Sequence, residues 1–311
     1  MERRYGRMRM MTTTCTQHAW IAPDGEVFSY SLWDAGASCG AVIVALHGLS
    51  GAALDYEPLG RHFAVHGLTT FAPELRGQGN DPQKRRRGDL QALDDWFADL
   101  QAFLDLVRLR HPSAPLYCYG ESMGAALLTR FFAREGARQD VAGLILASPV
   151  VALPRRPALW QRAVFQSLFA VAPRLRINVR KLARSKKNGA ISIVTRDEAH
   201  RKWFETTSHK LDRFTLRFFR RLLELIEGCG AAAERLHLPV LVLYAANDLF
   251  IPPARVEHFF ERLGTSDKEC CFFPESYHLL LHDLDQGQVL ERIEGWLLPR
   301  LAREMAGAKK A

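Results

Sequence analysis

A serine stands between two glycines in the stretch LYCYGESMGAALLTRFF, residues Leu116–Phe132. The residues before it form a short aromatic-rich run typical of a strand, and those after it are good helix formers. Gly120 and Gly124 leave room for a sharp strand-to-helix turn with Ser122 at its apex. There the hydroxyl would lie at a helix N-terminus, whose N–H groups favour negative charge. This setting suits a nucleophile, but serine also caps helices, so the five residues alone leave both interpretations open.

A base and an acid follow two later strand-like runs. Asp248 comes just after the apolar run VLVLYA, and His278 comes five residues after the run CCFF. In open α/β sheets, ligands meet the protein at the carboxyl ends of the strands, so these residues can share a site with Ser122. The chain order Ser, Asp, His is also one in which catalytic triads occur. We therefore expect Ser122 to attack, His278 to take its proton and Asp248 to orient the imidazole.

Each assignment has a competitor. Asp248 could simply cap the turn before Pro252-Pro253, and His282 competes with His278 as the base. Asp140 precedes a strand-like run and therefore lies at the wrong end of the sheet. Asp248 is thus the best acid available, and His278 is the expected base because the chain reaches it first after the strand.

An oxyanion site needs backbone N–H groups that point at the developing negative charge. Met123 directly follows the serine and provides one such donor. The apolar run AVIVAL leads into His47-Gly48-Leu49-Ser50-Gly51, and the N–H of Leu49 is the candidate for the second donor. We expect His47 to order this loop through hydrogen bonds rather than to act as a second base.

Strand-like and helix-like runs alternate along most of the chain. The helical pattern from Leu90 to Val107 repeats its apolar residues every three or four positions, with Asp89 as the expected N-cap. Such alternation predicts the α/β class, with a mostly parallel central sheet covered by helices on both faces. The strand-like runs are Glu26–Trp33, Ala41–Leu46, Leu68–Ala72, Leu116–Tyr119, Gly143–Ala147, Val240–Ala245 and Cys270–Phe273.

The alternation breaks between residues 150 and 236. This stretch holds the helical runs Trp160–Val171 and Phe214–Ile226, the basic loop RKLARSKKNGA and one weak strand candidate, Ala190–Val194. Because the strand pattern resumes at Leu238, an insertion fits better than a separate domain. We expect a disordered tail at 1–17, a core at 18–149 and 237–303, a basic helical cap at 150–236 and a second tail at 304–311.

The cap carries the charge of the molecule. From Arg155 to Arg221 there are 18 Lys and Arg against 4 Asp and Glu, whereas the rest of the chain has 24 basic and 30 acidic residues. Two interpretations stay open: a solvated face, or a surface that contacts anionic membranes peripherally. The cap aromatics could line an acyl pocket or form the cap's own core. They are Trp160, Phe165, Phe169, Phe214 and Phe218.

Several functional classes are disfavoured. No apolar run reaches the ~18 residues of a membrane span, and the basic start lacks the apolar region of a secretory signal. The six cysteines show no C-x-x-C spacing, so we expect a reducing, cytoplasmic setting. No phosphate loop, dinucleotide glycine pattern, zinc spacing or nucleic-acid motif occurs. We expect no cofactor, no metal and no nucleic-acid partner.

A set of motifs in order carries a family resemblance. The segments LHGLSG, PELRGQG, GESMG, ILASPV, NDLFIPP and YHLLLHD resemble those of the monoacylglycerol lipase and bacterial lysophospholipase group of serine hydrolases. The resemblance covers Ala41–Pro149 and Leu238–Leu298. It implies an α/β-hydrolase fold with a helical cap, the triad Ser122, Asp248 and His278, and oxyanion donors at Leu49 and Met123.

The resemblance also implies a serine ester hydrolase that cleaves acyl esters or lipids such as monoacylglycerols or lysophospholipids. Glu74 and Gln78 depart from the usual aspartate and histidine of one motif, and we expect structural roles for both. Two rivals stay open. One is other chemistry on the same triad, such as a short-chain esterase, an acyltransferase or a carbon–carbon hydrolase. The other is a non-catalytic binding or scaffold protein with this fold. Chain length, headgroup and oligomeric state stay open as well.

Overall fold

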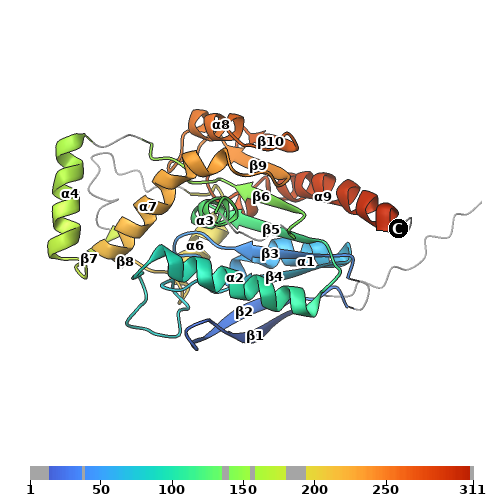
Figure 1. Cartoon of the computed structure of the whole chain (residues 1–311), viewed down its shortest axis with the longest axis horizontal. Helices are drawn as coiled ribbons and strands as arrows, with labels where there is room; N and C mark the ends of the chain where they lie inside the picture. Colours follow the sequence, from blue (N-terminus) through green and yellow to red (C-terminus); the bar gives the residue numbers. More distant parts are fainter. Residues whose placement is uncertain (1–13, 37–38, 135–139, 155–157, 180–193, 309–311) are drawn as a thin grey trace, which may run out of the picture.

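A mostly parallel sheet forms the centre of the molecule (Figure 1). The computed structural model describes residues 14–36, 39–134, 140–154, 158–179 and 194–308. The sheet strands are β1 (Cys15–Ile21), β2 (Val27–Trp33), β3 (Ala41–Leu46), β4 (Leu68–Pro73), β5 (Leu116–Glu121), β6 (Gly143–Ala147), β9 (Val240–Ala245) and β10 (Lys268–Phe273). Their order is β1-β2-β4-β3-β5-β6-β9-β10. The pairs β1–β2 and β2–β4 are antiparallel and the remaining pairs are parallel.

The central strands are buried along their whole length. Every residue of β3, β5, β6 and β9 is buried, which is expected where helices cover both faces of a parallel sheet. The predicted α/β class is therefore confirmed. The edge strand β1 was not predicted, because its sequence CTQHAWI is half polar and largely exposed. Residues 15–17, expected in a tail, belong to this strand.

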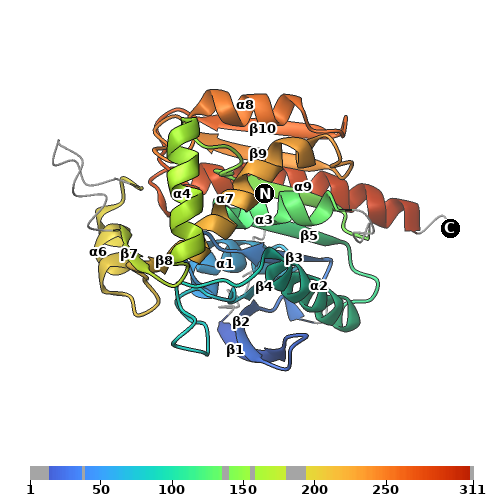
Figure 2. The ribbon, with the colours of Figure 1, turned by 60° about the vertical axis from the view of Figure 1, so that its left-hand side comes forward.

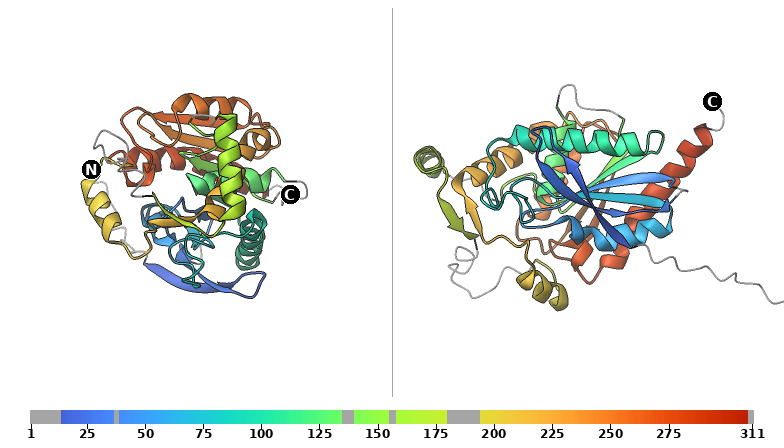
Figure 3. Two further views of the ribbon diagram at one scale, coloured as in Figure 1. Left: turned by 90° about the vertical axis from the view of Figure 1, so that its left-hand side faces the viewer. Right: turned by 90° about the horizontal axis from the view of Figure 1, so that it is seen from below.

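Helices pack on the two faces of the sheet. The helices α1 (Glu57–Val65) and α9 (Gln286–Ala308) bury apolar residues in one core cluster. On the opposite face lie α2 (Leu93–Arg110), α3 (Met123–Phe132), α7 (Leu216–Ala233) and α8 (Pro253–Glu261). The right-hand view of Figure 3 shows α2 and α9 on opposite sides of the sheet.

Two expectations about helix ends were wrong. Asp89 does not cap α2, which begins at Leu93; its carboxylate instead accepts hydrogen bonds from Thr215 and Arg217, which lie far along the chain. The tail expected at 304–311 is helical as far as Ala308, since α9 continues through it.

A smaller set of elements stands beyond the sheet (Figure 2). It comprises α4 (Leu159–Val171), α6 (Glu198–Thr206) and an antiparallel ribbon of β7 (Arg176–Asn178) and β8 (Arg213–Thr215). The expected cap, 150–236, extends too far. Helix α7 packs against α3, and its Phe218 and Cys229 are fully buried in the main core. The expected basic loop at 180–190 and most of the strand candidate Ala190–Val194 lie outside the described residues.

Among the described residues, no helix is both long enough and apolar enough to cross a membrane.

Candidate active site

Ser122 lies at a strained turn between β5 and α3. Its φ of 56° and ψ of −114° are unusual for a residue with a side chain. The backbone is tightly packed at this turn: a Cβ added to Gly124 would lie 2.0 Å from the Leu46 carbonyl oxygen, so only glycine fits there. Ser122 is partly exposed, and its side chain makes no capping hydrogen bond to α3. The geometry therefore disfavours the helix-cap interpretation and leaves the hydroxyl available at the helix N-terminus.

Asp248 and His278 contact each other from the loops after β9 and β10. His278 Nδ1 lies 2.7 Å from Asp248 Oδ2, and their side chains are only 5% and 2% exposed. The other carboxylate oxygen of Asp248 accepts the N–H groups of Phe250 at 2.8 Å and Ile251 at 3.2 Å. Asp248 thus orders its turn, as one interpretation expected, and also holds the imidazole. The hydrogen bond places the proton on Nδ1 and makes Nε2 the basic nitrogen.

His282, the competing base, lies in a different environment. It ends a short 3-10 helix, η3 (Leu280–His282), and its ring stacks on His200 with centroids 4.1 Å apart. Burial lowers the pKa of His282 to about 3. None of the described contacts of His282 is with Asp248, so Asp248 does not orient its ring as it orients that of His278.

The loop after β3 runs against the candidate nucleophile. A Cβ on Gly48 would lie 3.1 Å from the Cβ of Ser122. His47 lies beneath this loop: its Nδ1 donates to the Gly48 carbonyl at 2.9 Å, and its Nε2 accepts the Leu75 N–H at 3.2 Å. Complete burial lowers the pKa of His47 to about 4, so the ring is neutral and acts as a loop-ordering partner.

Gln78 and Glu74 support the same loop. The Gln78 side-chain oxygen accepts the Ser50 N–H at 3.0 Å, and Glu74 accepts the Ala53 N–H at 3.1 Å. Burial raises the pKa of Glu74 to about 7. Both side chains therefore hold backbone amides in place, in keeping with the structural roles expected from the sequence.

Two buried carboxyl groups of this region were not identified from the sequence. Asp55 accepts the Ala52 N–H at 2.8 Å, and burial raises its pKa to about 7. Glu121 directly precedes Ser122, and burial, together with the nearby charges of Asp55 and Asp248, raises its pKa to about 8. Its position at the end of an apolar strand-like run, next to the serine, is the sequence signal that could have identified Glu121.

Residues 194–196 of the inserted segment hold the loop that carries His278. The Leu279 N–H donates to the Val194 carbonyl at 2.9 Å, and Thr195 donates to the His282 carbonyl. Arg196 pairs with Asp283 at 3.1 Å and with Asp285 at 2.6 Å. This connection was missed because hydrogen bonds such as that from Thr195 to His282 join residues 87 positions apart, which no local sequence pattern predicts.

The cap aromatics divide into two groups. Phe214 and Phe218 are fully buried and pack in the core, whereas Trp160 on α4 is 69% exposed. Phe165 and Phe169 stack on each other and line a groove of about 390 Å³ between α4 and α7. None of Ser122, Asp248 and His278 lines this groove, so the structure does not connect these aromatics to an acyl site.

Comparison with known proteins finds sequence relatives that are named as lipases and phospholipases. The chain is 24% identical over 252 residues to the Bacillus subtilis phospholipase YtpA, with 81% of this chain and 92% of that protein covered. It is 23% identical to human monoglyceride lipase, with 91% and 90% covered. The structure of a soluble variant of the Saccharomyces cerevisiae monoglyceride lipase superimposes with a TM-score of 0.77 at 20% identity, with 94% and 97% covered.

The likeness to solved structures agrees with the α/β-hydrolase fold that the sheet order and the turn at Ser122 show. The profile of one family matches residues 37–285, which include the strand-to-helix turn and both loops that carry Asp248 and His278. The chain therefore belongs to that family, Hydrolase_4, described as Serine aminopeptidase, S33.

Proposed function

We propose that this ester-hydrolysing enzyme works through Ser122, His278 and Asp248. Ser122 attacks the ester carbonyl while Nε2 of His278 takes its proton, and Asp248 holds the imidazole and stabilises its charged form. His278 then protonates the leaving alcohol, and an acyl-enzyme forms on Ser122. The same histidine activates a water molecule for deacylation. The buried Asp248–His278 hydrogen bond at 2.7 Å is the observation that carries this proposal.

The oxyanion would be held by the N–H groups of Leu49 and Met123. Met123 is the first residue of α3, where helix N–H groups have no partner within the helix. Leu49 follows Gly48, whose backbone lies against Ser122. Within the described part of the chain, the Leu49 N–H donates to no other residue. Both amides are therefore suited to bind negative charge beside the serine.

We further propose that the substrates are monoacylglycerols or lysophospholipid-like acyl esters. The printed names of the relatives, a phospholipase and several monoglyceride lipases, support this substrate class. The apolar face of α4 supports it independently, because large exposed side chains gather there beside a groove. They are Trp160, Val164, Phe165, Leu168 and Val171.

Contact with an anionic membrane through the cap is part of the same proposal. The exposed apolar side chains of α4 would insert among lipids, and basic residues would be attracted to the anionic surface, each by about 1 kcal/mol. The protein should bind anionic vesicles at low salt and leave them by about 0.5 M NaCl, whereas neutral vesicles should bind little. Equal binding to both vesicle types, or binding to neither, would make the cap a solvated face.

The basic loop offers a variant for this test. Neutralising Arg180, Lys181, Arg184, Lys186 and Lys187 together should weaken binding to anionic vesicles and leave hydrolysis of a soluble short-chain ester intact. These five residues lie outside the described residues, so the expectation comes from their charge alone.

The substrate class is tested with p-nitrophenyl esters and monoacylglycerols of graded chain length. We expect kcat/KM to rise with acyl length and 1-monoacylglycerols to be cleaved. A short-chain esterase would prefer the acetate and butyrate esters, and an acyltransferase would transfer the acyl group to an added alcohol. A non-catalytic protein would hydrolyse none of the esters, which would reject the proposal as a whole.

A further inference from the structure

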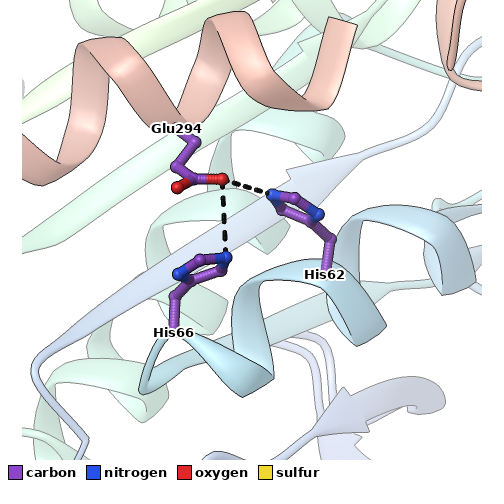
Figure 4. A group of neighbouring side chains, drawn as sticks. All are labelled: His62, His66 and Glu294. Carbon is purple, nitrogen blue, oxygen red and sulfur yellow. Dashed lines mark hydrogen bonds and ion pairs between the residues drawn. The ribbon is translucent and has the colours of Figure 1, made fainter. Parts of the chain in front are cut away.

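Two histidines and a glutamate meet on the face of the sheet covered by α1 and α9 (Figure 4). His62 lies on α1, and Glu294 lies on α9. His66 directly follows Val65, the last residue of α1, and lies one helical turn beyond His62. Oε2 of Glu294 is 3.0 Å from Nε2 of His62 and 3.4 Å from Nε2 of His66. One ligand atom from each residue lies within 4.8 Å of the other two.

The two N···O separations match those around a bound transition metal. Zinc takes imidazole nitrogen at about 2.0–2.1 Å and carboxylate oxygen at about 2.0–2.2 Å, so neighbouring ligand atoms of a tetrahedral site lie about 3.3 Å apart. The two N···O separations fall on either side of that value. Histidines four residues apart on a helix also share one face, which lets both rings reach the same ion.

The surroundings favour a cation. His66 caps the C-terminal end of α1, where the helix dipole is negative, and Glu294 adds a carboxylate. Among the basic and histidine side chains that the structure describes, His62 and His66 alone pair with Glu294. The three side chains are 24%, 32% and 28% exposed, which leaves an ion an entry path and room for a water ligand.

We propose that His62, His66 and Glu294 form a binding site for a first-row divalent cation of the zinc class. Imidazole nitrogens with one carboxylate suit Zn²⁺, Co²⁺ and Ni²⁺ better than Mg²⁺ or Ca²⁺, which prefer oxygen ligands. The ion would join α1 to α9, which lie on the same face of the sheet. Helix α1 runs from the carboxyl end of β3 to the amino end of β4. Its last turn therefore lies near the amino ends of the strands, whereas Ser122 lies at their carboxyl ends. The site is therefore structural rather than catalytic.

Zinc titration of the chelator-treated full-length protein tests this site. Isothermal titration calorimetry should show one Zn²⁺ per chain, and saturating Zn²⁺ should raise the midpoint of thermal unfolding. His66→Ala and Glu294→Gln should each weaken binding by about tenfold or more and reduce the thermal shift, while circular dichroism shows that they fold. The matched control is His258→Ala, which removes an exposed histidine from α8. It should bind as the wild type does.

Co²⁺ supplies a readout that an ordinary His–Glu ion pair would not give. The wild type should develop the visible absorption bands of Co²⁺ in a low-coordinate site, and the bands should disappear in His62→Ala and in His66→Gln. Ester hydrolysis should be the same in the wild type and His66→Ala, with or without Zn²⁺. The proposal is overturned if His258→Ala loses binding as His66→Ala does. It is equally overturned if the wild type fails to bind Zn²⁺ at about 100 µM, which would leave the three residues as ion pairs.

Discussion

The region around Ser122, at the carboxyl ends of the central strands, and the cap beyond it differ in which side chains they bury and which they expose. At the carboxyl ends of the strands near Ser122, the side chains of His47, Gln78 and Asp248 are buried, and each makes a hydrogen bond with the backbone. In the cap, Trp160 and Val171 are 69% and 85% exposed. Buried polar groups that are held by hydrogen bonds fix a geometry, whereas exposed apolar groups gain stability only from something that covers them. The region around Ser122 is therefore suited to catalysis, and the cap is suited to contact with lipid.

The two histidines of the loop after β10 give the largest expected difference in activity. His278→Ala should lower kcat by about 10⁶, because the base is lost, whereas His282→Ala should retain most activity. The ring of His282 stacks on His200, so its loss should reduce the thermal unfolding midpoint rather than the rate. Steady-state kinetics on a soluble ester and a thermal melt of both variants provide the measurement. If His282→Ala is the inactive variant, the base is wrongly assigned.

Asp248→Asn should lower kcat by a smaller factor, about 10⁴, because asparagine favours the wrong imidazole tautomer. Its amide oxygen can still accept the Phe250 and Ile251 N–H groups, so the turn should keep its shape. Folding is checked by circular dichroism and activity by burst kinetics. Near-wild-type activity would mean that Asp248 serves only its turn.

Replacing exposed apolar residues of α4 tests whether this helix contacts lipid. Trp160→Ser combined with Val164→Ser should weaken binding to anionic vesicles by about tenfold or more, since less apolar surface enters the lipid. Hydrolysis of a soluble short-chain ester should be unchanged. Leu109→Ser is the matched control, because Leu109 is 84% exposed on α2. An equal loss of binding in the control, or none in the α4 variant, would contradict a role for this face.

A pH-dependent effect on stability is expected from Glu121, the buried carboxyl group that directly precedes Ser122. Burial raises the pKa of Glu121 from 4.5 to about 8, so the folded state keeps a proton that the unfolded state releases between these values. The contribution of Glu121 to the free energy of unfolding is therefore complete below pH 4.5 and falls as the pH rises towards 8. Glu121→Gln should lack that fall. Its stability relative to the wild type should be higher at pH 9 than at pH 5 by a few kcal/mol, measured by urea unfolding.

Glu291→Gln on the exposed face of α9 is the control, and its stability relative to the wild type should not change between the two pH values. A pH-independent difference for Glu121→Gln would mean that Glu121 is ionised in the folded protein.

Local patterns predicted the parts of the fold that local physics determines. The strands β3, β6 and β9 are uninterrupted apolar runs, and the candidate triad residues follow strand ends that are visible in the sequence. Asp89 was misassigned because its partners lie more than 120 positions away. The cluster of His62, His66 and Glu294 was missed for the same reason, since no spacing rule joins α1 to α9.

Labelling with a fluorophosphonate probe shows whether Ser122 is the nucleophile. The probe reacts with a serine only when that serine is activated as a nucleophile. We expect one adduct, on the tryptic peptide that contains Ser122, identified by mass spectrometry. We also expect that Ser122→Ala folds, takes no label and loses about 10⁶ in kcat. An adduct on another serine, or more than a few per cent of activity in Ser122→Ala, would contradict the assignment of Ser122 as the nucleophile.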